Sequence, residues 1–451
     1  MRTNRTMDMT RGNILQHILI FTIPLFIGVI FQQLYNIMDM VIAGYLLEDK
    51  ALAAIGATST LYSLVIGFSN GMNNGFGIIW ARRFGAKDED GLRDAIGAAL
   101  ILNGFLIFGM TSLSVLGLKV FLRFMCVPQS IFERSYEYIM VILLGIGVTL
   151  LYNMEGGILR AVGNSRVPLY FVIVTSILNI FFNLVLVICF HMDVAGLALG
   201  TVIAQGISVL GCFFYITKNY PELKLSKKNF VLNKNLLGEL FTTGLSMGLM
   251  SSIFSIGSVI LQSGINKLGL VYVTAHTAAR RIIEIFMQPF AALATAAATF
   301  VSQNFGAGEG KRIVDGIKTT CKVSFCWAVF SFVILYVFGE DIVFLLTHTK
   351  NKEVIDNAIM NIHININFFI FLGILVVLRS SLQGFGRKIV PLIASSIELG
   401  MKIFSKFFIV PRFGYVGASY TEPSTWLVCM VFLLLVALVL GKQFNTFLET
   451  K

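Results

Sequence analysis

The first long apolar stretch of the chain places the strongest constraint on its fold. Residues 14–47 read ILQHILIFTIPLFIGVIFQQLYNIMDMVIAGYLL and include no lysine or arginine. A helix rises ~1.5 Å per residue, so about 20 apolar residues cross a bilayer core. This stretch is therefore predicted to span a membrane. It nevertheless carries a carboxylate, Asp39, and Gln32 and Asn36 fall on the same face of the predicted helix.

An ionisable group at membrane depth is costly, about 2.5–3.5 kcal/mol on insertion scales, and normally faces a protein interior or a water-filled cavity. Asp39 is the clearest such group in the first half of the chain, where we interpret it as the lone carboxylate at depth. It is predicted to mark an ion or substrate pathway enclosed by other helices.

Composition extends this prediction to the whole chain. Of its 451 residues, 56% are hydrophobic and 13% are charged, whereas soluble domains carry about 25% charged residues. Mean hydropathy is +0.81. The net charge of +11 does not indicate nucleic acid, because the lysines and arginines lie mostly in short loops. The six cysteines form no CxxC pair and are predicted to be small buried residues, not disulfides or metal ligands.

The chain also lacks the motifs of several enzyme classes. It has no GxxxxGK[ST] loop for nucleotide binding and no HExxH. We therefore expect no enzymatic activity, no cofactor and no metal centre, and an ion gradient as the energy source.

Twelve membrane spans are predicted from the apolar runs, which makes the fold class all-α integral membrane. The spans cover about 14–45, 51–82, 95–119, 132–158, 167–190, 195–217, 236–265, 271–303, 312–338, 355–380, 389–410 and 415–441.

Basic residues are concentrated in every second loop between the predicted spans. One set of loops and the N-terminus carry Arg2, Arg5, Arg11, Arg82, Arg83, Lys87, Arg93, Arg160, Arg166, Lys218, Lys224, Lys227, Lys228, Lys234, Lys311, Arg312, Arg379, Arg387 and Lys388. Because basic loops stay in the cytoplasm, both termini and the connector 218–235 are predicted there, in a plasma (inner) membrane protein.

An internal repeat with an offset near 221 residues divides the chain. The tripeptide FGA occurs at 84–86 and again at 305–307, and LRAVGNSRVPL at 159–169 corresponds to LQGFGRKIVPL at 382–392. Each half therefore has six helices and the same topology. We expect an N-lobe over 1–217, a cytoplasmic linker over 218–235 and a C-lobe over 236–451. The two lobes would be related by a pseudo-two-fold axis along the membrane normal and would work by alternating access.

These features resemble the multidrug and toxic compound extrusion (MATE) transporters of the MOP flippase superfamily. The resemblance rests on the six-plus-six arrangement, on both FGA tripeptides, on LRAVGNSRVPL and on SQNFGAG at 302–308. It implies export of small organic, often cationic compounds in antiport with protons or sodium. The expected partners are those substrates and the lipid bilayer, with no nucleic acid, and we expect a monomer.

The resemblance also implies a cation-coupling site in the N-lobe. The matching positions are Asp39, Asn179, Asn183 and Thr201, with Asn36 beside Asp39 on its helix face. Where the family pattern has an aspartate, this chain has Asn183. Amide oxygens can still bind sodium, while a lone carboxylate can instead carry a proton, so both ions remain open. Inter-helix hydrogen bonding is the alternative role for the two asparagines.

The C-lobe carries more charge within its spans. Arg280 and Glu284 are four residues apart, as are Glu398 and Lys402, and Glu422 lies in the next span. These groups form either stabilising ion pairs or a substrate or proton site.

Two other functions remain as alternatives to antiport. A lipid-linked saccharide flippase of the same superfamily would need a wide cationic cavity. An intramembrane lipid-modifying enzyme would need clustered His, Asp or Ser, and no such cluster is visible in the sequence.

Overall fold

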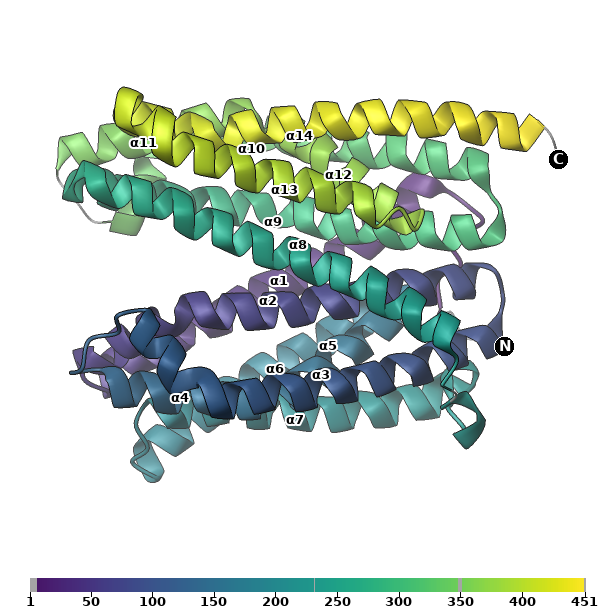
Figure 1. Cartoon of the computed structure of the whole chain (residues 1–451), viewed down its shortest axis with the longest axis horizontal. Coiled ribbons are helices and arrows are strands. Elements are labelled where there is room, and N and C mark those ends of the chain that lie inside the picture. The colour runs from purple at the N-terminus through teal and green to yellow at the C-terminus, as the bar shows by residue number, and fades with distance from the viewer. Residues whose placement is uncertain (1–5, 231, 348–350, 450–451) are drawn as a thin grey trace. The chain divides into compact units, whose positions relative to one another are not determined.

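The computed structural model describes residues 6–230, 232–347 and 351–449, and over these residues every regular element is a helix (Figure 1). The α-helices are α1 (Ile14–Leu46), α2 (Asp49–Gly85), α3 (Glu89–Phe124), α4 (Phe132–Leu144), α5 (Ile146–Ala161), α6 (Arg166–Leu184), α7 (Val194–Asn219), α8 (Lys234–Ile265), α9 (Leu270–Ala307), α10 (Gly310–Thr347), α11 (Lys352–Asn367), α12 (Phe369–Gly384), α13 (Ile389–Phe404) and α14 (Val410–Glu449). Short π-helical segments η1 (Val185–Cys189) and η5 (Ser405–Ile409) extend α6 and α13. The predicted all-α class is confirmed.

The apolar helices account for twelve spans. In the described part of the chain, nine continuous helices are long and apolar enough to cross a membrane, and two bent pairs, α4 with α5 and α11 with α12, pass the same test. One of the nine, Ile389–Val439, has 51 residues and would reach ~75 Å as a straight helix, far beyond a bilayer core of about 30 Å. It contains a non-helical residue, Gly414, with φ 56° and ψ −140°. Ile389–Val439 therefore holds two spans, which brings the total in the described residues from eleven to twelve.

Two predicted spans are broken. Residues 132–158 form α4 and α5, which meet at Gly145 with a bend of 47°. A Cβ on Gly145 would lie 2.4 Å from a methyl carbon of Val202, so the glycine lets α7 approach the bend. Residues 355–380 form α11 and α12, which are bent by 51° at Phe368.

The chain divides into two compact units. Unit 1 comprises Met1–Asp8 and Ile23–Gly248, and unit 2 comprises Met9–Thr22 and Leu249–Lys451. The division falls inside α8, because the first half of α8 packs closely on α2. A Cβ on Gly75 would lie 2.6 Å from the Cα of Gly244, so the two backbones are almost in contact there.

The connector 218–235 is held against unit 1. It forms two short 3-10 turns, Pro221–Leu223 and Lys227–Asn229. The Asn229 amide donates to Asp94 at 2.8 Å, and Arg93 Nε donates to the Glu222 carbonyl oxygen at 2.9 Å. The connector therefore packs on the first turns of α3.

Candidate functional site

Asp39 lies on α1 within unit 1 and contacts Asn183 near the end of α6. The Asn183 amide nitrogen donates to Asp39 Oδ1 at 2.6 Å. Asn183 is fully buried, and a Cβ on Gly200 would lie 2.1 Å from its side-chain oxygen. Glycine at position 200 therefore lets α7 approach the asparagine and fix its position beside the carboxylate.

The hydrogen bonds continue from Asn183 to α7. Asn183 also donates to Asn179 Oδ1 at 3.4 Å, and Asn179 Nδ2 donates to Thr201 Oγ1 at 2.9 Å. The structure therefore brings together four of the predicted residues, Asp39, Asn179, Asn183 and Thr201. The fifth, Asn36, is exposed.

Three tyrosines that the sequence interpretation did not single out lie close to this site. Tyr35, Tyr62 and Tyr138 each interact electrostatically with the Asp39 carboxylate. Tyr62 and Tyr138 come from α2 and α4, so their proximity depends on helix packing and has no signal in sequence spacing. Tyr35 precedes Asp39 by four residues on α1, so its place on the same helix face could be read from the sequence.

The interpretation of Asp39 as the lone N-lobe carboxylate at depth is wrong. Glu155 lies within α5, inside the bent pair that spans the membrane. Its Oε2 atom is buried and has no hydrogen-bond partner among the described residues, and the side chain lies beside Cys212 of α7. Its position in the predicted span 132–158 was a sufficient signal to find it.

In unit 2 the predicted charges form two groups. Arg280 and Glu284 are 2.8 Å apart on α9 and are partly exposed. The deeper group centres on Lys402, whose Nζ lies 3.2 Å from Glu398 and 3.4 Å from Glu422. Lys402 is 1% exposed, so its charge is compensated by carboxylates and not by water.

Two further contacts accommodate the Lys402 side chain in the interior of unit 2. Its Nζ lies 4.6 Å from the ring centroid of Phe254, within range of a cation–π contact. A Cβ on Gly257 would lie 2.9 Å from Lys402 Cδ, so the glycine leaves room for the lysine stem. Arg379, predicted in the loop before α13, instead lies inside α12 and pairs with Glu398 at 3.3 Å.

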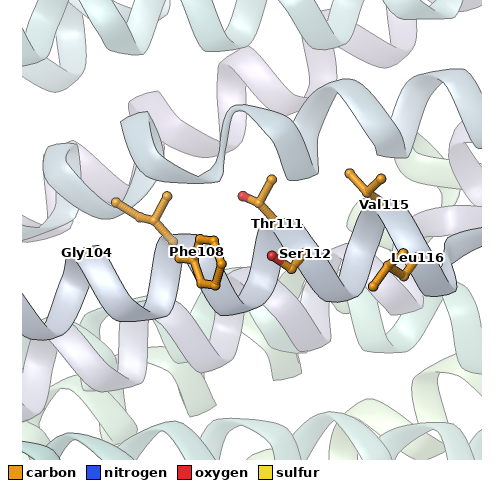
Figure 2. Close-up of a pocket in the computed structure, with 7 residues that line it drawn as sticks. Gly104, Phe108, Thr111, Ser112, Val115 and Leu116 are labelled. Atoms are coloured by element: carbon orange, nitrogen blue, oxygen red, sulfur yellow. The ribbon is translucent and has the colours of Figure 1, made fainter.

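A separate pocket of about 580 Å³ lies along α3. Figure 2 shows its lining side chains, which include Phe108, Thr111 and Leu116, spaced along this one helix. Phe108 and Leu116 are highly exposed, as expected for a lipid-facing surface. The pocket includes none of the polar residues around Asp39.

The Asp39 site has the chemistry of a single titratable carboxylate with amide and hydroxyl neighbours. Within the described residues, no three His, Cys, Asp or Glu side chains are grouped as metal ligands would be. Asn183 presents its NH₂ group to Asp39, and an NH₂ group donates to a carboxylate but cannot bind a cation.

Comparisons with known proteins identify relatives over nearly the whole chain. The MatE family model matches residues 24–185 and 246–408, once in each half, in agreement with the internal repeat. The probable multidrug resistance protein YpnP of Bacillus subtilis is 27% identical over 339 residues, which cover 74% of each chain. The multidrug export protein MepA of Staphylococcus aureus is 22% identical over 408 residues, which cover 89% of this chain and 88% of MepA. A solved structure of MATE in complex with MaL6 covers 100% of both chains with a TM-score of 0.90 at 21% identity.

Proposed function

This chain belongs to the MatE family of membrane transporters, and we propose that it exports small organic, often cationic compounds in antiport with protons. The family and its relatives are multidrug transporters and not enzymes. The class of substrate and the coupling ion of this transporter are our proposals.

The hydrogen bond between Asn183 and Asp39 is the observation that carries the choice of proton over sodium. Sodium is a hard cation that needs several converging oxygen atoms. Here Asp39 Oδ1 accepts a hydrogen bond from the Asn183 NH₂ at 2.6 Å. A partner of this kind stabilises a carboxylate and leaves it free to take up and release one proton.

Protonation of Asp39 would change the polar chain behind it. The ionised carboxylate accepts from Asn183, which also donates to Asn179, and Asn179 donates to Thr201. A neutral carboxylic acid is a weaker acceptor, so proton uptake weakens the contact between α1 and α6. This coupling of one proton to a helix contact is the proposed basis of alternating access.

The charged residues of unit 2 support a mainly structural role. Glu398, Glu422 and Glu284 each have a cationic partner within 4 Å. We propose that these ion pairs stabilise unit 2. A proton or substrate site that includes Arg280, Glu284, Glu398 and Lys402 is the second candidate, and it is favoured if Asp39 proves dispensable.

The remaining proposals concern setting and partners. We place the protein in the bacterial inner membrane as a monomer with both termini in the cytoplasm, from its basic loops and its bacterial relatives. The lipid-linked saccharide flippase is the competing function.

Dye transport by purified protein in proteoliposomes tests the proposal. A proton gradient and a sodium gradient are imposed separately, and movement of a fluorescent organic cation is followed. The proposal predicts transport with protons alone. Transport with sodium alone would reject proton coupling. No transport with either gradient would favour the flippase, which is then assayed with a lipid-linked saccharide.

A further inference from the structure

We propose that Glu155 is a second proton-carrying carboxylate of unit 1, and that a buried polar stripe on α7 connects it with Asp39. The inference rests on the proposed proton antiport. It adds a second station, at the other end of the six-helix bundle, to a path that otherwise has only one.

The stripe consists of four polar residues on one face of α7, which we call the α7 stripe: Thr201, Gln205, Ser208 and Cys212. Their spacing of four, three and four residues is the spacing of one helix face. The side chains of Gln205, Ser208 and Cys212 are less than 10% exposed. From the first to the last residue the stripe extends over about 16 Å of helix.

Polar partners from the neighbouring helices accompany the stripe. Gln205 accepts a hydrogen bond from Thr149 of α5 at 2.7 Å. The hydroxyl oxygens of Ser208 and Thr175 of α6 are 2.6 Å apart, and the Thr175 oxygen lies 3.4 Å from the Tyr152 hydroxyl. Each level of the stripe therefore has at least one exchangeable proton.

The two carboxylates lie at the two ends of this stripe. At its first residue, Thr201 is linked through Asn179 and Asn183 to Asp39. At its last residue, Cys212 lies beside Glu155. Neighbouring stripe residues are one helical turn apart, about 5–6 Å between Cβ atoms, a gap that one water molecule can bridge.

The surroundings of Glu155 leave it able to change its charge. The titratable neighbour that α7 places against it is Cys212. The hydrogen bonds that α2, α3 and α6 make to α5 come from neutral side chains, namely Asn73, Asn103 and Thr175. On α5 itself, Tyr152 and the cation Arg160 interact electrostatically with each other. No ion pair fixes Glu155 in its ionised form among the described residues.

The proton step balances without another reactant. The proton released by the Asp39 carboxylic acid leaves Asp39 as a carboxylate. The Glu155 carboxylate takes up a proton at the other end of the stripe and becomes a carboxylic acid. Its buried Oε2, which has no hydrogen-bond partner among the described residues, is the available acceptor. Glu155 then releases the proton at the end of unit 1 where α5 ends and α6 begins.

The substitution Glu155→Gln separates this role from a purely structural one. Glutamine has nearly the same shape, and its amide oxygen can still accept from Cys212, so packing and stability are retained. It cannot carry a proton. We expect the rate of proton-driven dye transport to fall by about tenfold or more and to lose its pH dependence. Dye affinity and thermal stability in detergent should stay at the wild-type value.

Matched variants keep the test decisive. Glu137→Gln changes an exposed glutamate of α4 and should transport dye like the wild type. If Glu155→Gln is unstable, Cys212→Ser and Cys212→Val decide instead. Serine keeps an exchangeable proton beside Glu155 and should retain transport, whereas valine removes it and should slow transport.

Two outcomes would overturn the inference, and they can be told apart. If the wild type is proton-driven and Glu155→Gln keeps both its rate and its pH profile, the second station is rejected while proton antiport stands. The same follows if the serine and valine variants transport equally. If the wild type itself responds only to sodium, the proposed function fails and the proton path fails with it.

Discussion

Asp39 is partly buried against neutral hydrogen-bonding side chains, so in the proposed mechanism its proton occupancy sets the charge of the site. Replacing it by asparagine keeps the shape and a hydrogen-bonding partner for Asn183 but removes the exchangeable proton. We expect Asp39→Asn to reduce proton-driven dye transport to the level of empty liposomes, with the protein still folded and monodisperse in detergent. Glu133→Gln, which changes an exposed carboxylate, is the matched control. Full transport by Asp39→Asn would move the coupling site to unit 2.

The proposed choice of proton over sodium rests on Asn183. Its amide nitrogen lies 2.6 Å from Asp39 Oδ1, so an aspartate at this position would place two carboxylates side by side. Two adjacent carboxylates repel each other unless a cation lies between them. We expect Asn183→Asp to make dye transport respond to a sodium gradient, measured in the same proteoliposomes. A variant that stays insensitive to sodium would show that the amide is not what excludes the ion.

Lys402 compensates two glutamates in the interior of unit 2. Lys402→Met keeps the length of the side chain but leaves Glu398 and Glu422 without the cation 3.2 and 3.4 Å away. Breaking a buried ion pair costs about 3–5 kcal/mol, so a clear fall in the thermal unfolding midpoint in detergent is expected. Lys406→Met is the control, because Lys406 lies over the Phe407 ring. Equal midpoints for the two variants would mean that the pairs contribute little to stability.

The sequence predicted some of these residues better than others. Asp39 was found because a charge within an apolar run is conspicuous, whereas Asn179 and Asn183 were found through the resemblance to the MATE transporters. Arg379 was assigned to a loop because it lies near the end of an apolar run. Its pairing with Glu398 depends on how α12 packs against α13, and no spacing along the chain encodes that contact.

At the scale of elements, the start of α3 shows a helix cap outside the membrane spans. Asp88 Oδ1 accepts from the Gly91 backbone nitrogen at 2.9 Å, and Arg83 lies 2.8 Å from Asp88 Oδ2. The Gly91 N–H, and secondarily Arg83, hold the pKa of Asp88 below its usual value. Because the folded-state pKa is lowered, the cap stabilises fully above the pKa of the unfolded chain. That contribution is lost as the pH falls through the lower pKa of the folded state.

Removing this cap should therefore have a pH-dependent effect. Asp88→Ala is expected to cost about 1 kcal/mol near neutral pH, measured as a lower unfolding midpoint in detergent. The difference from wild type should shrink as the pH is lowered below the ordinary range of a carboxyl group. Asp90→Ala, which removes a side chain that is 90% exposed, should change the midpoint less. A pH-independent difference would mean that the charge of Asp88 does not contribute.

The element boundaries also show the limit of apolar periodicity. Residues 132–158 and 355–380 were each predicted as one span because apolar residues continue through both bends. The bend at Gly145 depends on the approach of α7, and the one at Phe368 on a local backbone change to φ −103° and ψ 1°. Hydropathy along the sequence does not indicate either bend. The connection between the predicted spans 51–82 and 95–119 is likewise shorter than predicted, because α2 extends to Gly85 and α3 begins at Glu89.

At the scale of the whole molecule, the repeat was readable because its signals lie at the ends of helices. FGA stands at the end of α2 in the first half and at the end of α9 in the second. The π-helical segments η1 and η5 begin at Val185 and Ser405, close to the repeat offset of 221. A π-helical turn inside a span commonly marks a functional or strained position. Its occurrence at equivalent places in both halves means that the two halves share local backbone detail as well as topology.

The number of spans fixes a relation between the chain ends that can be measured. Twelve spans are an even number, so we expect both termini on the same side of the membrane, and the basic loops predict the cytoplasmic side. A short epitope tag at either terminus should be reached by antibody in inside-out vesicles and protected in right-side-out vesicles. A tag inserted at residues 191–193, between α6 and α7, should behave in the opposite way. One terminus exposed on each side would require an odd number of spans, and Ile389–Val439 would then have to cross the membrane once.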